Sequence, residues 1–172
     1  MYMSSTRKSL STAERVIVGL ATLGVACMGY LTYVHFQREG STLCDLAPGF
    51  SCEIVNKSIY AEIFGFPVSL LGLAYFVAVI LVTVGRIRNG ARAIELFTLG
   101  AIFFSLYLTG VELYLLASIC IFCEFSKILM LAILGITYDV SRRAGEKISH
   151  RHRLFAAVAG IAGTIAAYFI QR

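Results

Sequence analysis

Hydrophobic residues are gathered in five long runs along the chain, and short polar or basic segments separate these runs. Each run comes close to the roughly 20 residues that a helix needs to cross the hydrocarbon core of a bilayer. The pattern predicts membrane-spanning helices at about residues 16–34, 67–84, 94–117, 120–138 and 154–170. We therefore expect an all-α membrane protein whose residues 1–172 form a single integral membrane domain.

The longest polar segment, residues 36–66, lies between the first two hydrophobic runs and has a net charge of −2. It contains two cysteines, Cys44 and Cys52. Its last part, residues 58–66, alternates poorly as a strand. We expect a short helix there that lies in the membrane interface, with Tyr60, Ile63 and Phe64 toward the lipid.

The composition supports a membrane protein. Hydrophobic residues make up 58% of the chain and charged residues 15%. In soluble domains about 45–50% of the residues are apolar and about a quarter are charged. The mean hydropathy is +0.80. The net charge of +5 could suggest a nucleic-acid partner. We exclude one, because the basic residues fall in the short connections between the hydrophobic runs.

The basic residues also predict the orientation in the membrane. With the N-terminus inside, residues 1–15, 85–93 and 139–153 are internal, and they hold 11 of the 15 Lys and Arg residues. Such an excess is typical of the cytoplasmic side. Residues 36–66 are then external, as is the short turn before Cys120. We expect these cysteines on the extracytoplasmic, oxidising side of a membrane.

The strongest chemical motif is a C-x-x-C pair, Cys120 and Cys123, at the start of the fourth run. A helix N-terminus favours thiolate and therefore redox activity. Half of a zinc site, or two buried thiols, would show the same motif.

Two cysteine pairs on one face of the membrane can exchange a disulfide. The outer pair, Cys44 and Cys52, could react with a soluble protein and the inner pair with a quinone. We expect no metal site, and we interpret Cys27 as a packed thiol.

Lys127 lies one turn inside the fourth predicted span. A lysine at this depth is costly unless it forms an ion pair or extends to the headgroups. Because of this cost, Lys127 is a candidate functional residue. Glu124 is three positions earlier and could pair with it. If Lys127 is functional, it would stabilise the Cys123 thiolate or a reduced quinone anion.

These residues occur in an order that resembles the vitamin K epoxide reductase (VKOR) family, in its bacterial form. Seven residues separate Cys44 from Cys52, and Ser58 follows six positions later. The segment FGFPVSLLG opens the second run, and CIFC opens the fourth. The disulfide-bond protein B family has similar chemistry, but its C-x-x-C pair comes first.

The resemblance implies a four-helix transmembrane bundle around a quinone pocket, with the fifth transmembrane helix packed outside. It also implies that Cys44 takes electrons from a thioredoxin-fold partner and that Cys52 passes them to Cys120. Cys123 would then face the quinone, and Ser58 would form a hydrogen bond near the pocket.

Two departures from the family pattern narrow this expectation. Animal members carry an asparagine and a tyrosine where this chain has Val68 and Lys127, which favours a quinone of the ubiquinone or menaquinone type over vitamin K epoxide. Many relatives carry a fused thioredoxin-like domain, whereas this sequence ends at Arg172. We therefore expect a separate extracytoplasmic thioredoxin-fold (DsbA-type) partner and a multi-pass protein of a bacterial inner or cell membrane.

The predicted function is that of a membrane thiol–disulfide oxidoreductase that supports disulfide bond formation. Its cofactor-binding candidates are Ser58, Cys123 and Lys127. Three alternatives remain open. One is a vitamin K epoxide or quinone reductase proper. Another is a non-enzymatic membrane protein in which Cys44–Cys52 is a structural disulfide. The third is a protein stabilised by zinc.

Overall fold

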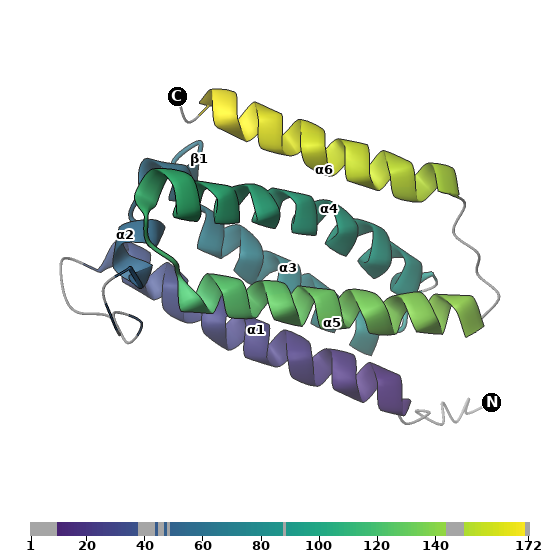
Figure 1. Cartoon of the computed structure of the whole chain (residues 1–172). Helices are drawn as coiled ribbons and strands as arrows, with labels where there is room; N and C mark the ends of the chain where they lie inside the picture. Colours follow the sequence, from purple (N-terminus) through teal and green to yellow (C-terminus); the bar gives the residue numbers. More distant parts are fainter. Residues whose placement is uncertain are drawn as a thin grey trace, which may run out of the picture.

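The computed structural model describes residues 10–37, 44, 47, 49–87, 89–143 and 150–170. In these residues the helices and strands follow one another from purple to yellow in Figure 1. They are α1 (Thr12–Phe36), α2 (Cys52–Asn56), a 3₁₀ turn (Ile59–Ala61), β1 (Glu62–Ile63), β2 (Phe66–Pro67), α3 (Val68–Val84), α4 (Gly90–Val111), a π-helical turn (Glu112–Leu116), α5 (Ile121–Arg143) and α6 (His150–Ile170).

The long helices coincide with the five hydrophobic runs, and the protein is an all-α membrane protein as predicted. In the described residues, three helical segments are long and apolar enough to cross a membrane: Thr12–Phe36, Gly90–Leu116 and Ile121–Arg143. Shorter apolar helices occupy Val68–Val84 and His152–Ala166. The expected number of five spans remains a prediction.

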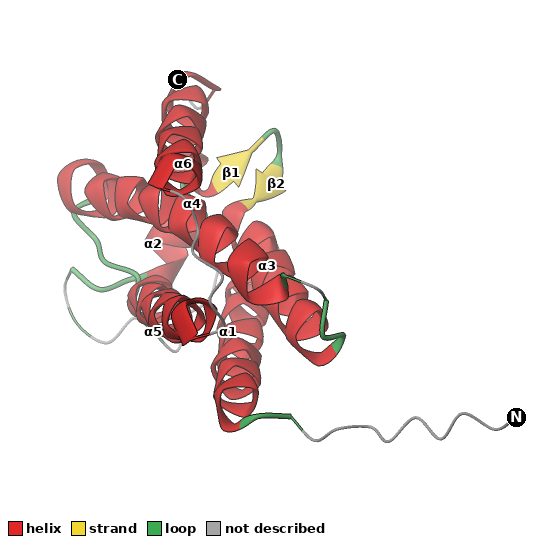
Figure 2. Ribbon diagram, turned by 90° about the vertical axis from the view of Figure 1, so that its right-hand side faces the viewer, coloured by secondary structure: helices red, strands yellow, loops and turns green. Residues whose placement is uncertain are grey.

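Four helices form a closed bundle, in which α1 packs on α3 and α5, and α4 packs on the same two helices. The fifth long helix, α6, lies outside this bundle against α4, as Figures 1 and 2 show. Gly160 and Gly100 permit the close approach of these two helices. A Cβ atom at Gly160 would lie 2.8 Å from the carbonyl oxygen of Gly100. This arrangement agrees with the one that the family resemblance implied.

Local sequence signals explain where the helices begin. Ser11 and Glu14 form a capping box that starts α1, which satisfies backbone N–H groups at its first turn. Pro67 precedes α3. Its missing N–H has no cost there, because the first N–H groups of a helix have no intrahelical partner. Between the helices, the fully buried side chains of Phe76, Leu31 and Ile133 belong to the core.

Residues 58–66 correct one prediction, because they do not form the expected interfacial helix. A short 3₁₀ turn is followed by a hairpin in which β1 pairs antiparallel with β2. Phe64 and Gly65 connect the two strands, with φ angles of 52° and 79°. Two consecutive residues with positive φ form the tight turn that suits a two-residue hairpin. The chain therefore reverses where a helix would have continued, although Phe64 is exposed as expected.

Candidate redox site

The outer cysteine pair is closed as a disulfide between Cys44 and Cys52, whose Cα atoms are 5.6 Å apart. Cys52 is the first residue of α2. The Ser51 hydroxyl caps this short helix by accepting a hydrogen bond from the backbone N–H of Ile54 at 3.2 Å. Between the two cysteines, the N–H of Phe50 donates to the Ala47 oxygen at 3.0 Å, whereas Leu46 and Pro48 lie outside the described residues.

The inner pair begins α5, as the C-x-x-C motif predicted. Cys120 directly precedes the helix, and its carbonyl oxygen accepts a hydrogen bond from the N–H of Glu124 at 3.0 Å. The Cys123 N–H donates to the Cys120 Sγ atom at 3.3 Å, and the two Sγ atoms are 2.6 Å apart. Both cysteines have free thiols. The N–H groups of a first helical turn stabilise a thiolate.

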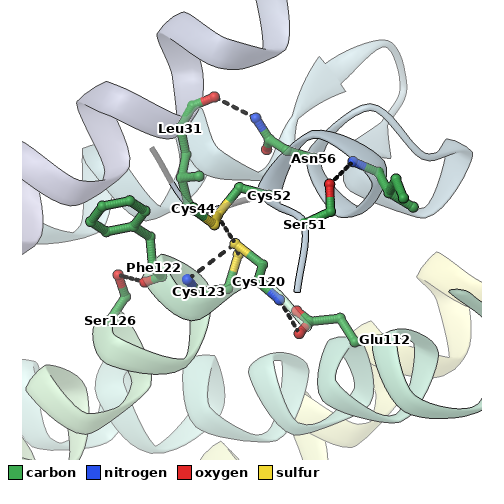
Figure 3. The surroundings of a disulfide bond; sticks show 11 residues. Leu31, Cys44, Ser51, Cys52, Asn56, Glu112, Cys120, Phe122, Cys123 and Ser126 are labelled. Carbon is green, nitrogen blue, oxygen red and sulfur yellow. Dashed lines mark hydrogen bonds between the residues drawn. A yellow bond between two sulfur atoms is a disulfide. The ribbon is translucent and has the colours of Figure 1, made fainter. Parts of the chain in front are cut away.

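The two pairs meet, although they are far apart in the sequence. The Sγ atoms of Cys52 and Cys120 are 3.2 Å apart (Figure 3). Two backbone hydrogen bonds hold the segments together beside this contact. The Ser51 N–H donates to the Ile119 oxygen at 3.2 Å, and the Ile119 N–H donates to the Gly49 oxygen at 2.9 Å. The outer and inner cysteines are therefore within reach of thiol–disulfide exchange.

The burial of Cys44 corrects another expectation. A cysteine that reacts with a soluble partner, as expected for Cys44, should face water, but its exposed fraction is 1%. Cys52 and Cys120 are fully buried beside it, and all three belong to the hydrophobic core cluster that also contains Leu31. The reason is that the disulfide draws Cys44 onto Cys52, which itself packs against the start of α5.

Glu112 is a buried acid at this site that our sequence reasoning did not single out. Only 2% of the residue is exposed, and its Oε2 atom accepts a hydrogen bond from the Cys120 N–H at 3.1 Å (Figure 3). It begins the π-helical turn at the end of α4. Such turns are rare in proteins, and those that occur are often found at functional sites. An acid near the end of a hydrophobic run was the only signal in the sequence.

Lys127 is buried and has its partners inside the bundle. Its exposed fraction is 9%, and its Nζ atom donates hydrogen bonds to Glu124 and to the hydroxyl of Thr109 on α4. The expected ion pair between Glu124 and Lys127 is therefore present. Of its two partners, the sequence predicted only the one on the same helix.

A cavity of about 210 Å³ opens between the helices next to the inner pair. Apolar side chains such as Leu31, Phe76 and Met130 provide most of its lining. All three residues predicted to bind the cofactor line the cavity, namely Ser58, Cys123 and Lys127. The polar side chains of Glu112 and Ser69 also line it. The cavity thus combines a mostly apolar wall with a few polar groups, as small-molecule sites do.

The two serines of this wall differ in their hydrogen bonds. The Ser58 hydroxyl donates to the Val55 oxygen at 2.8 Å, so it is held in a fixed direction at the cavity. The hydroxyl of Ser69, in the first turn of α3, is buried without a partner among the described residues. A buried polar atom of this kind usually has an explanation in ligand or water binding.

Polar contacts fix the outer segment onto the bundle. The Asn56 side chain donates to the Leu31 carbonyl (Figure 3), and the backbone carbonyl oxygen of Asn56 lies 2.7 Å from the His35 Nδ1 atom. The His35 Nε2 atom lies 3.4 Å from Glu62. His35 thus connects the end of α1 to α2 and β1.

The alternative of a zinc site can be compared with this geometry. The sulfur atoms of Cys44, Cys52 and Cys120 all lie within 4.8 Å of one another. Zinc binds deprotonated thiolates. The disulfide removes two of the three from that role in the state that the structure describes.

The comparison with known families agrees with the order of these motifs. A family model described as the vitamin K epoxide reductase family matches residues 15–138. The match includes most of α1, all of α3 and α4, both cysteine pairs and most of α5. It therefore contains all the residues that we predicted to be catalytic or to bind the cofactor. The chain belongs to the vitamin K epoxide reductase family, and is thus a membrane oxidoreductase.

Proposed function

We propose that the protein is a quinone-dependent thiol–disulfide oxidoreductase that oxidises a thioredoxin-fold partner and thereby supports disulfide bond formation. The observation that carries this proposal is the row of sulfur atoms from the outer pair to the cavity. Cys52 lies 3.2 Å from Cys120, and Cys120 lies 2.6 Å from Cys123, which lines the cavity.

The row supports a relay in two exchange steps. A Cys52 thiolate attacks the Cys120–Cys123 disulfide at Cys120, which forms the Cys52–Cys120 bond and releases the Cys123 thiolate. Cys44 then attacks Cys52, forms the outer disulfide and releases Cys120. The outer pair ends oxidised and the inner pair reduced. The structure describes this pairing, a closed Cys44–Cys52 disulfide beside two free thiols.

The partner would return the outer pair to its reduced form. Its thiolate attacks Cys44, releases Cys52, and a second thiol of the partner resolves the mixed disulfide. The partner is oxidised and the outer pair gains the two electrons. Because Cys44 is 1% exposed, this attack requires a displacement of the groups that bury it. We therefore infer that the partner binds a conformation in which Cys44 is uncovered.

The cavity residues fit a quinone as the electron acceptor. A quinone ring is flat and mostly apolar with two carbonyl oxygens, and the cavity offers apolar walls with few polar groups. When bound, it supplies an acceptor for two electrons and two protons. Cys123 would face it, Ser58 would lie beside it, and the Lys127 ammonium would favour negative charge at Cys123 or on the reduced acceptor.

The rival reading as a structural disulfide is less well supported by this geometry. A structural bridge needs no free thiol at its sulfur atoms, whereas Cys52 contacts the buried thiol of Cys120.

The orientation in the membrane forms part of the proposal as well. We place the cysteine end of the bundle on the extracytoplasmic side of a bacterial inner or cell membrane, since disulfides persist in oxidising compartments.

The proposal is tested on the inner pair. Cys123→Ser should abolish quinone reduction by a dithiol donor in the purified protein, because no second thiol remains to complete the two-electron step. The same should hold for Cys120→Ser. Quinone absorbance in the presence of excess dithiol measures the rate.

The control is Cys27→Ser on α1, which removes a partly buried free thiol that belongs to neither pair. We expect this variant to keep most of the wild-type rate. A required Cys27 together with a dispensable Cys120 would refute the relay. A wild-type protein that reduces no quinone under these conditions would refute the proposed acceptor.

A further inference from the structure

Glu112 has no role in the relay as proposed above, although it lies inside the helical segment Gly90–Leu116 that can cross the membrane. It is 2% exposed and lines the cavity. An ionisable side chain at such a place is costly and usually has a function. The question is what a carboxyl group provides here that a neutral side chain would not.

The surrounding backbone fixes the position of this carboxyl group. The π-helical turn that begins at Glu112 ends at Ala117, which has a φ angle of 48°. The chain then turns back, so that the N–H of Ser118 donates to the Glu112 carbonyl oxygen at 3.1 Å. The N–H of Cys120 donates to Glu112 Oε2, also at 3.1 Å (Figure 3). The carboxyl group therefore lies beside the backbone of Cys120 and at the wall of the cavity.

Hydrogen bonding alone does not require an acid at this position. A glutamine has a side-chain oxygen that could accept the same Cys120 N–H. Among the described residues, Glu112 forms no salt bridge, because the Nζ atom of Lys127 is bound to Glu124 and Thr109. What distinguishes glutamate from glutamine is that it can take up and release a proton.

The oxidation of the inner pair creates a need for such a group. When Cys120 and Cys123 form a disulfide, two S–H bonds break, one S–S bond forms, and two electrons and two protons leave. Cys120 is fully buried, so its proton has no direct access to water. Cys123 lines the cavity and can pass its own proton there.

We propose that Glu112 is the proton carrier between the inner thiol pair and the cavity, an inference that rests on the proposed quinone reduction. Its carboxylate accepts the proton that Cys120 loses and passes it to the acceptor in the cavity. The second proton comes from Cys123, and both electrons leave with the formation of the disulfide. The acceptor gains two electrons and two protons, and the carboxylate is regenerated.

Other titratable groups face the same cavity and have to be separated from Glu112. They are Lys127 and Cys123 on α5, Tyr60 in the 3₁₀ turn and Tyr75 on α3. Glu124 is linked to the cavity through Lys127. A substitution at Glu112 that keeps all of these groups, and keeps the hydrogen bond from Cys120, is therefore the informative one.

Glu112→Gln in the full-length protein meets this requirement. The oxidation of the reduced inner pair by a short-chain ubiquinone analogue is followed by stopped-flow absorbance, over a range of pH and in H₂O and D₂O. We expect the variant to be slower by roughly 10²-fold, as for the loss of a general acid–base group. The part of the pH profile due to Glu112 should disappear, and the solvent isotope effect should rise because proton transfer becomes limiting.

Two further measurements show whether Glu112→Gln displaces Cys120 or removes the proton transfer. In a Cys44→Ala and Cys123→Ala background, Glu112→Gln should still yield the Cys52–Cys120 disulfide on a non-reducing gel. Glu95→Gln is the matched control, since Glu95 is a buried acid of the same helical segment, Gly90–Leu116, that pairs with Arg153 instead. It should keep the wild-type pH profile and isotope effect.

The outcomes distinguish this inference from the proposed function. A wild-type rate and isotope effect in Glu112→Gln would overturn the carrier role while quinone reduction stands. Loss of the Cys52–Cys120 disulfide in the glutamine variant would also overturn it, because Glu112 would then act by positioning Cys120. If the wild-type protein is not oxidised by the quinone at all, the proposed function fails and the carrier role falls with it.

Discussion

The two outer cysteines differ in the sulfur atoms that they can reach. Cys52 contacts Cys120 across 3.2 Å, whereas the Sγ atom of Cys44 is bonded to Cys52. A mixed disulfide accumulates only when the thiol that would resolve it is missing. The identity of the cysteine that is removed therefore decides which complex can be trapped.

Cys52→Ala should trap a covalent complex between Cys44 and the thioredoxin-fold partner, and Cys44→Ala should not. Non-reducing gels of each variant, with and without the oxidised partner, measure this difference, because the free Cys44 thiolate forms a mixed disulfide by attacking the disulfide of that partner. In the isolated protein, Cys44→Ala combined with Cys123→Ala should leave Cys52 bonded to Cys120, because these two sulfur atoms already lie in contact.

A purely structural disulfide predicts another pattern. Both single variants would only lose stability, by about 2–4 kcal/mol for a bridge of this kind, and neither would form a complex. The absence of any Cys52–Cys120 species in the double variant would count strongly against the relay.

At the scale of elements, the contact between α1 and α3 sets one wall of the cavity, to which Met28 on α1 and Phe76 on α3 contribute. Gly24 is essential to the approach of these helices. A Cβ atom at this position would lie 2.4 Å from two ring atoms of Phe76, whose side chain is fully buried. To make room, the ring would have to shift from its buried position in the wall of the cavity.

Gly24→Ala should therefore destabilise the protein by about 1–3 kcal/mol, the usual cost of overpacking a core. Gly19→Ala on the same helix is the matched control. It meets nothing within 4 Å and should stabilise the protein by up to about 1 kcal/mol through helix propensity. Unfolding in mixed micelles with increasing SDS, followed by circular dichroism, measures both. Equal stability of the two variants would disagree with the packing shown here.

At the scale of the whole molecule, the two ends of the bundle have different chemistry. The helices α1, α3, α4 and α5 alternate in direction, so that both cysteine pairs lie at the end that carries α2 and the hairpin. At the other end, Arg86 follows α3, and Arg142 and Arg143 lie in the last turn of α5. Excess basic charge at one end is typical of the cytoplasmic side. The N-terminal Arg7 and Lys8, which contributed to that prediction, lie outside the described residues, as do Arg88, Lys147 and Arg172.

We expect a membrane-impermeant thiol reagent to label Ile59→Cys and to miss Ile87→Cys in intact cells. These positions lie at opposite ends of the bundle, and both isoleucines are exposed. The variants are made without Cys27, Cys120 and Cys123, while the Cys44–Cys52 disulfide is kept. Disrupted cells, in which both positions should react, provide the control. The reverse pattern in intact cells would refute the orientation and the role in disulfide formation.

The sequence alone determined the class of the protein and the local chemistry. Long hydrophobic runs must form helices in a membrane, because every backbone hydrogen bond has to be satisfied there. The C-x-x-C spacing placed two thiols one helical turn apart, and the spacing of Glu124 and Lys127 on the same helix predicted their pair. These features depend on residues within one or two turns of each other.

Only the tertiary structure decided which groups meet across the bundle. The contact of Cys52 with Cys120 joins residues 68 positions apart, and that of Lys127 with Thr109 joins two helices. The burial of Cys44 and the direction of Glu112 likewise depend on how the outer segment and the π-helical turn pack against the start of α5. Periodicity shows which face of a helix is apolar, but it does not specify the rotation and depth at which two helices pack. Those are set by complementary shapes such as Gly24 against Phe76, and they position the sulfur atoms.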